Sequence, residues 1–156
     1  MNARKKALKD AGREDTFPDG VADLTREQAK RILKEDFYDQ YRLKEIEDDR
    51  LAHQLLDIYA NTKTESLRTI VQGAVHRVMR DYDLYGPDSQ PFQPTDPIGP
   101  RTRERLNWLV SNGFGRELRN ELVMRRLAYL GGPAGLKSRR GLVWRVLRFL
   151  EDQRPD

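Results

Sequence analysis

The sequence contains no cysteine and only two histidines among its 156 residues. The lack of cysteine excludes disulfide bonds, thiolate metal sites and catalysis by a cysteine nucleophile. His53 and His76 are too few for a histidine-based zinc cluster, and no serine or carboxylate is spaced from them as in a catalytic triad. We therefore expect surface or packing roles for both histidines, and we expect neither a metal ion nor a cofactor.

Long apolar runs are also lacking. No run approaches the roughly 20 apolar residues that a membrane-spanning helix needs. The N-terminal segment 1–6 carries basic side chains at positions 4–6, but no apolar segment of a secretory signal peptide follows it. We expect a protein that is made in the cytoplasm and has no membrane span. Any action outside the cell would then require another agent to release or export it.

The basic residues are distributed unevenly along the chain. Residues 101–156 contain 13 lysines and arginines against 6 aspartates and glutamates, a net charge of +7, whereas the whole chain carries +4. The first 100 residues are therefore net acidic by 3. An excess of arginine favours anionic partners such as nucleic acid, anionic lipid or acidic cell-envelope polymers. A solvated helical surface explains the same excess equally well.

Apolar residues recur at helical spacing through most of the chain, and no segment alternates as a strand does. The first helix has a clear start, because Thr25 and Gln28 form a capping-box pattern. The sequence therefore predicts an all-α protein. We expect six helices, at about 25–37, 49–61, 64–79, 100–112, 114–130 and 138–151.

A proline-rich segment separates these helices into two groups. Residues 84–98 contain four prolines in fifteen positions, which exclude a helix there. We interpret this segment as a hinge between two helical subdomains. The predicted boundaries are 1–83 for the first subdomain, 84–98 for the hinge and 99–156 for the second subdomain.

Two carboxylates lie on or beside apolar helical stripes. Asp36 and Asp57 are expected to be partly buried, and a carboxylate in that position is either functional or paired with a backbone group or an arginine. The acidic run at 45–49 is instead typical of a solvated loop or a helix N-terminus. Aromatic residues concentrate between the first helix and the proline-rich segment, where both a sugar-binding surface and a hydrophobic core are open interpretations.

Three patterns in the first half resemble, in order, the domain of glycoside hydrolase family 108. Residues 23–29 (DLTREQA), followed by 36–38 (DFY), resemble one helix of that domain. Residues 52–61 (AHQLLDIYAN) resemble a helix that ends in asparagine, and 71–75 (VQGAV) resemble the stretch after it.

Three later patterns resemble the predicted peptidoglycan-binding domain that is usually fused to this hydrolase. They are residues 96–102 (DPIGPRT), 125–129 (RRLAY) and 141–146 (GLVWRV). Two positions depart from that domain. Pro97 replaces a glycine, and Leu142 replaces a tryptophan that here occurs two positions later, as Trp144.

The resemblance implies a lysozyme-like helical scaffold and an N-acetylmuramidase, which cleaves the glycan strand of peptidoglycan. Family members are often phage endolysins or proteins described as secretion activators. By this resemblance Asp57, Asn61 and Gln72 would lie near the glycan cleft, and Tyr38 would be a platform for a sugar ring. The expected partners are peptidoglycan glycan strands, reached through phage lysis or a dedicated export route. Nucleic acid is the least favoured partner, because the arginines are dispersed over three helices and no DNA-reading motif is present.

The catalytic glutamate of the family is not found in the sequence. In the family it lies in a Glu-Gly-Gly motif near the N-terminus of the domain, whereas Glu14 is the only glutamate before Glu27 and its neighbours differ from that motif. Glycoside hydrolysis generally needs a proton donor at the glycosidic oxygen. The catalytic residue is therefore unassigned, and Glu14, Asp36 and Asp57 are the carboxylates to test.

Two functions stay open. The first is a peptidoglycan-directed muramidase-family protein whose acid comes from elsewhere, for example from a separate N-terminal fragment. The second is a non-catalytic peptidoglycan-binding protein, or an accessory protein of a phage or secretion system.

Overall fold

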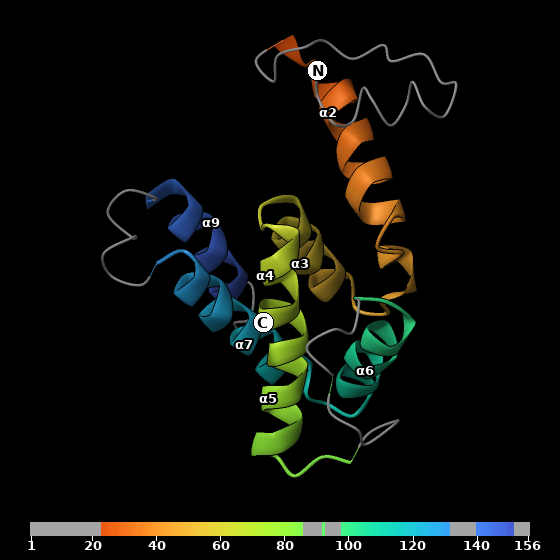
Figure 1. Cartoon of the computed structure of the whole chain (residues 1–156), viewed down its shortest axis with the longest axis vertical. Coiled ribbons are helices and arrows are strands. Elements are labelled where there is room, and N and C mark those ends of the chain that lie inside the picture. Colours follow the sequence, from red (N-terminus) through yellow and green to blue (C-terminus); the bar gives the residue numbers. More distant parts are fainter. Residues whose placement is uncertain (1–22, 86–91, 93–97, 132–139, 152–156) are drawn as a thin grey trace.

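The computed structural model describes residues 23–85, 92, 98–131 and 140–151. Glu14 and most of the proline-rich segment lie outside these residues, and so do the side chains of Leu142 and Trp144. Every regular element in the described part is helical (Figure 1). The prediction of an all-α protein is confirmed. No helix in this part of the chain is both long enough and apolar enough to span a membrane.

Seven α-helices, two π-helical segments (η2 and η4) and one 3-10 turn (η3) make up the described part. In chain order they are α2 (Arg26–Leu33), η2 (Lys34–Asp39), η3 (Leu43–Glu45), α3 (Asp49–Ala60), α4 (Thr64–Leu67), η4 (Arg68–Gln72), α5 (Gly73–Asp81), α6 (Pro100–Ser111), α7 (Gly115–Tyr129) and α9 (Arg140–Glu151).

Local chemistry explains where these helices begin and end. The Thr25 hydroxyl accepts a hydrogen bond from the Gln28 amide at 3.2 Å, and the Gln28 side chain accepts one from the Thr25 amide at 2.9 Å. This confirms the predicted capping box. Pro100 occupies the first turn of α6, where its missing N–H costs no hydrogen bond. Gly113 and Gly131 follow α6 and α7 with φ of +87° and +103°, a backbone conformation that favours glycine and ends each helix.

The rod that runs from α4 through η4 to α5 differs from the single helix that the sequence predicts there. Its middle, Arg68–Gln72, is π-helical. A π-helical turn spaces its hydrogen bonds five residues apart, and single turns of this kind are frequent at functional sites. The apolar pattern does not reveal such a turn, because Ile70, Val71, Val75 and Val78 are buried as an ordinary helix would bury them.

The main hydrophobic core contains side chains from both sides of the proline-rich segment. It joins buried residues of α3, η4 and α5 to Leu106 and Leu109 of α6 and Leu118 and Leu122 of α7. A smaller cluster of Val123, Leu130 and Val146 joins α7 to α9. The division into two subdomains stays a prediction, and any test of it must explain this shared core.

Polar contacts also join the two sides of the proline-rich segment. Glu45 accepts a 2.7 Å hydrogen bond from Nε of Arg103, and its backbone oxygen accepts a 2.6 Å bond from the Asn107 amide. Asp48 caps α3 through the Leu51 amide at 2.6 Å and pairs with Arg119 at 3.1 Å. The acidic run therefore includes a helix cap, as expected, but two of its carboxylates bind arginines of α6 and α7 instead of being only solvated.

Helix α2 stands away from the rest of the molecule (Figure 1). It has no buried residue, and Leu33 at its end is exposed. Segment η2 continues its path toward the core, where Phe37 and Tyr38 pack at the edge of the main cluster.

Candidate functional site

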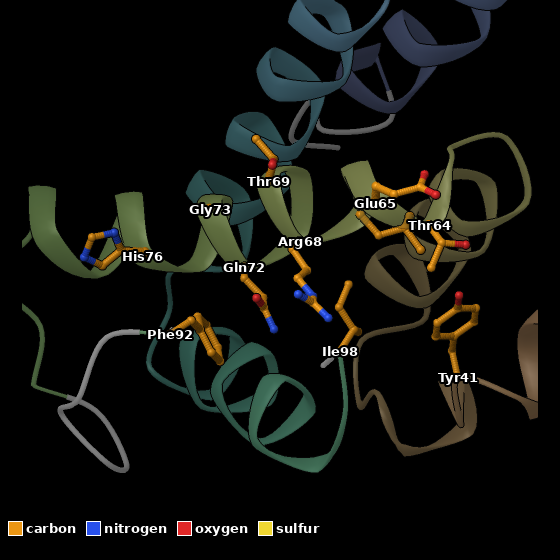
Figure 2. Close-up of a pocket in the computed structure, with 11 residues that line it drawn as sticks. Tyr41, Thr64, Glu65, Arg68, Thr69, Gln72, Gly73, His76, Phe92 and Ile98 are labelled. Atoms are coloured by element: carbon orange, nitrogen blue, oxygen red, sulfur yellow. The ribbon is translucent and has the colours of Figure 1, made fainter. Parts of the chain in front are cut away.

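A cavity of about 660 Å³ lies beside the α4–η4–α5 rod (Figure 2). One wall is the rod itself, and the remaining walls come from the turn before α3 and from the segment that leads to α6. The residues that line the cavity are Tyr41, Thr64, Glu65, Leu67, Arg68, Thr69, Gln72, Gly73, His76, Phe92 and Ile98. The volume is in the range of about 300–1,000 Å³ that is typical of small-ligand sites.

Segment η4 contributes the polar groups of the wall. Figure 2 shows the side chains of Arg68 and Gln72 pointing from η4 to the same side, between Phe92 and Ile98. Gln72 is only 4% exposed, and its amide nitrogen donates to the Thr102 hydroxyl at 3.3 Å. A glutamine buried to this extent has a fixed amide, which suits a specific hydrogen bond to a ligand.

The apolar part of the cavity comes from aromatic and aliphatic side chains. The guanidinium of Arg105 lies 4.4 Å from the centre of the Phe92 ring, and that of Arg101 lies 5.6 Å from it. These cation–π contacts fix the ring from the α6 side. Ile98, two residues before the start of α6, packs against the core and adds an apolar surface to the cavity.

Tyr41 forms the end of the cavity nearest α3. Its ring stacks on Tyr59 with the ring centres 4.1 Å apart. Burial raises the pKa of the Tyr41 hydroxyl above its usual value of 10, so that the group stays protonated at neutral pH and can donate a hydrogen bond. In Figure 2 this hydroxyl points toward Thr64.

Charged groups of both signs surround the mouth of the cavity. Arg68, His76 and Glu65 are all exposed. Among the described residues that line the cavity, Glu65 is the only carboxylate. The general acid of a glycosidase is normally a partly buried carboxyl group, whereas Glu65 is exposed.

The structure separates the four residues that the sequence analysis assigned to a glycan cleft. Gln72 lines the cavity. Tyr38 lies in η2 at the edge of the core and is not among the lining residues, whereas Tyr41, three positions later, is. Asp57 and Asn61 also do not line it. Their side chains bind each other at the end of α3, where Asn61 Nδ2 donates to Asp57 Oδ1 at 3.1 Å.

Asp57 belongs to a charged junction that joins α3 to α7 and α9. We define this junction as Asp57, Asn61, Arg126 and Arg145. The Asp57 carboxylate lies 3.8 Å from Nη2 of Arg126 and 3.4 Å from Nε of Arg145. Arg126 also donates to the Asn61 backbone oxygen at 3.4 Å. Asp57 is therefore paired with arginines, which is one of the two alternatives that its sequence position left open.

The sequence analysis missed Tyr41 and Arg68 as lining residues. Arg68 lies on the polar side of its helix, where sequence periodicity predicts only solvent exposure. The aromatic bias included Tyr41 but did not distinguish it from its neighbours. Asp36 is partly buried in η2 and does not line the cavity.

A comparison with sequence profiles of protein families matches residues 3–62 to the family described as Glycosyl hydrolase 108. Over this segment, which is less than half of the chain, the protein is similar to glycoside hydrolase family 108. The match supports, at the level of the family, a function of the peptidoglycan-hydrolase type. No curated protein and no solved structure matches the chain.

The family 108 segment includes α2, η2, η3 and α3 among the described elements. It supplies Tyr41 to the cavity, and its helix α3 forms the base of the core on which the rod packs. The match confirms the resemblance read from residues 23–29, 36–38 and 52–61. The resemblance of the later patterns to a peptidoglycan-binding domain stays a prediction, because they lie beyond the matched segment.

Proposed function

We propose that this chain binds the glycan strands of peptidoglycan and that the cavity beside η4 holds part of a strand. The family 108 segment supports the class of ligand, and the cavity provides a place for it. The proposal depends chiefly on one observation: apolar faces of Tyr41, Phe92 and Ile98 meet the polar groups of Arg68 and Gln72 in one cavity.

This combination suits an amino sugar. Sugar rings present apolar faces to aromatic and aliphatic side chains and direct hydroxyl and acetamido groups outward. Gln72 and Thr69 can exchange hydrogen bonds with such groups. Arg68 and His76 can face the carboxylates of the peptide stems that the glycan carries, because a guanidinium binds carboxylates with short, charge-assisted hydrogen bonds.

We propose binding as the function of the chain by itself, and cleavage only when a proton donor is supplied. Retaining and inverting glycosidases usually use two carboxylates at the scissile bond. The described lining of the cavity contains only the exposed Glu65. The acid would therefore come from outside the described residues or from a separate fragment. Without it, the chain acts as a peptidoglycan-binding or accessory protein that reaches the wall by phage lysis or a dedicated export route.

A sedimentation assay with insoluble peptidoglycan tests this proposal. We expect the wild-type chain to pellet with the walls. Arg68→Ala should raise the apparent Kd about tenfold, since a hydrogen bond to a charged group contributes roughly 1.5–3 kcal/mol. Arg116→Ala, which removes the same charge from an exposed position on α7, is the matched control and should bind as the wild type does.

Two further outcomes would contradict the proposal. A chain that does not pellet with walls but shifts DNA in a salt-sensitive manner would be a nucleic-acid binder. Lysis of purified walls by the isolated chain in a turbidity assay would show that it contains a working proton donor, and the restriction to binding would then be wrong.

A further inference from the structure

The π-helical turn has a hydrogen-bond pattern that leaves out one carbonyl group. The Gly73 amide donates to the oxygen of Arg68, five residues earlier, and to that of Ile70, three residues earlier. In an α-helix the same amide would donate to the oxygen of Thr69, four residues earlier. The Thr69 carbonyl therefore does not receive the α-helical hydrogen bond from Gly73.

A side chain from another helix binds this carbonyl. Nη1 of Arg125, on α7, donates to the Thr69 oxygen at 3.0 Å. Nε of the same guanidinium donates to Glu121 at 2.7 Å, one turn earlier on α7. Glu121 thus orients the planar guanidinium, and its Nη1 is directed at the π-helical turn.

The contact requires a glycine at position 73. A Cβ atom on Gly73 would overlap Nη1 of Arg125 and would lie 2.9 Å from its Cζ. The backbone of Gly73 has ordinary helical torsion angles, with φ of −62°, so conformational freedom is not the reason for a glycine here. The missing side chain leaves the space through which Arg125 reaches the rod.

The turn has a direct effect on the cavity. The rod lines the cavity with residues on both sides of the turn: Thr64, Glu65 and Arg68 at its start, and Gln72, Gly73 and His76 at its end. A π-helical turn contains more residues per turn than an α-helical one, so a change between the two hydrogen-bond patterns rotates the later residues relative to the earlier ones. The relative orientation of the two ends of this wall therefore depends on the turn.

We propose that Arg125 is a positioning residue, which stabilises the π-helical turn and thereby holds Arg68, Thr69 and Gln72 toward the ligand. The inference rests on the proposed function for the identity of the ligand. The geometric part, that Arg125 and Gly73 together maintain the turn, is independent of any ligand.

The first test measures the turn itself. Isotope-labelled full-length chain is compared with Arg125→Ala, Gly73→Ala and the double variant by NMR, through the carbonyl shift of Thr69 and the amide shift of Gly73 or of the alanine that replaces it. For Thr69 we expect the same displacement in all three variants, because the alanine Cβ at 73 expels the guanidinium. Unchanged Thr69 and Gly73 signals in Arg125→Ala would overturn the proposal.

The second test measures binding of soluble peptidoglycan fragments that carry peptide stems, by calorimetry at a temperature where every variant is folded. We expect Arg125→Ala to raise Kd about tenfold, which corresponds to about 1.4 kcal/mol. Gly73→Ala should behave in the same way, and the double variant should be no weaker than Arg125→Ala. If the fold-increases in Kd of the two single variants multiplied in the double variant, the two residues would act independently, and the steric link between them would be wrong.

Arg125→Lys distinguishes positioning from a general structural role. Lysine keeps the charge but cannot bind Glu121 and Thr69 in the planar geometry of the guanidinium. We expect it to recover part of the affinity and part of the Thr69 shift. If the variants of Arg125 and Gly73 melt at lower temperatures but keep the wild-type Kd and the wild-type Thr69 chemical shift, the role of Arg125 is merely structural and the proposal is overturned.

The two tests fail separately. If the wild-type chain does not bind the fragments at all, the proposed function is wrong, but the NMR comparison still decides whether Arg125 and Gly73 maintain the turn. If the wild type binds and Arg116→Ala weakens binding as much as Arg125→Ala, the effect is one of net charge, and the positioning role is wrong.

Discussion

The cavity and the charged junction both place polar side chains next to the hydrophobic core, but they use them in opposite ways. In the junction, Asp57 lies between Arg126 and Arg145, so that the charged groups face one another. In the cavity, Gln72 and Arg68 line open space. A buried polar residue therefore indicates a binding site only when its neighbours leave room for a ligand.

The difference also appears in the electrostatics. Arg126 is 1% exposed, and burial lowers the pKa of its guanidinium, while the nearby Asp57 carboxylate raises it. The charged pair compensates part of the cost of burying the cation. Arg68 and His76, which line the cavity, are exposed.

The largest expected effect follows from removing the anion that faces the buried guanidinium of Arg126. Asp57→Asn should lower the free energy of unfolding by about 3 kcal/mol, because it leaves the buried Arg126 without its counter-charge. Chemical denaturation measures this loss. Peptidoglycan binding by the folded fraction should stay unchanged. Glu104→Gln, on the exposed side of α6, is the control and should change stability by less than about 0.5 kcal/mol. A loss of binding at full stability would instead place Asp57 in the glycan site, as the family resemblance predicts.

A substitution in the cavity should show the reverse pattern. Gln72→Ala removes an amide that lines the cavity and that the proposed function assigns to the ligand, so we expect Kd for peptidoglycan fragments to rise about tenfold, or about 1.4 kcal/mol. The chain offers a matched control in Gln54, another buried glutamine, whose amide donates to the Arg119 backbone oxygen at 3.0 Å. Gln54→Ala should reduce stability and leave Kd unchanged. Equal effects of the two substitutions on Kd would contradict the assignment of the cavity.

The smallest effect is expected at the exposed edge of the junction. Arg145 pairs with the same carboxylate as Arg126, but its side chain is 57% exposed. Exposed ion pairs contribute little, so Arg145→Ala should lower the free energy of unfolding by about 0.5 kcal/mol or less. Chemical denaturation of Arg145→Ala and of Asp57→Asn, compared side by side, separates the contribution of Arg145 from that of Arg126. A loss as large as that of Asp57→Asn would mean that Arg145, and not Arg126, is the main partner of the carboxylate.

The sequence predicted the helices well because their signals are local. The capping box at Thr25, the proline at position 100 and the glycines that follow α6 and α7 each act within a few residues of the helix ends that they determine. The apolar spacing likewise identified the buried face of α5. The family resemblance of the first half needed only short patterns in the right order.

The site could be predicted only in part, because it depends on contacts between distant segments. Asp57 and Gln72 look alike in sequence, as polar residues near apolar stripes. What distinguishes them is their surroundings: Asp57 faces two arginines from α7 and α9, whereas Gln72 bonds to Thr102 and also lines the cavity. The π-helical turn was equally hidden, since Arg125 lies 56 positions beyond the Thr69 carbonyl that it binds.

Helix α2 and helix α3 lie in the same family 108 segment but differ in how they are tied to the rest of the chain. Leu51, Leu55 and Ile58 of α3 are fully or almost fully buried, so that α3 can unfold only with the core. Helix α2 has no buried residue, and short helices are marginal without tertiary packing. The boundary between cooperative folding units therefore falls within the family 108 segment. We therefore expect α2 to open locally at a small free energy, whereas the cavity shares its stability with the core to which α3 belongs.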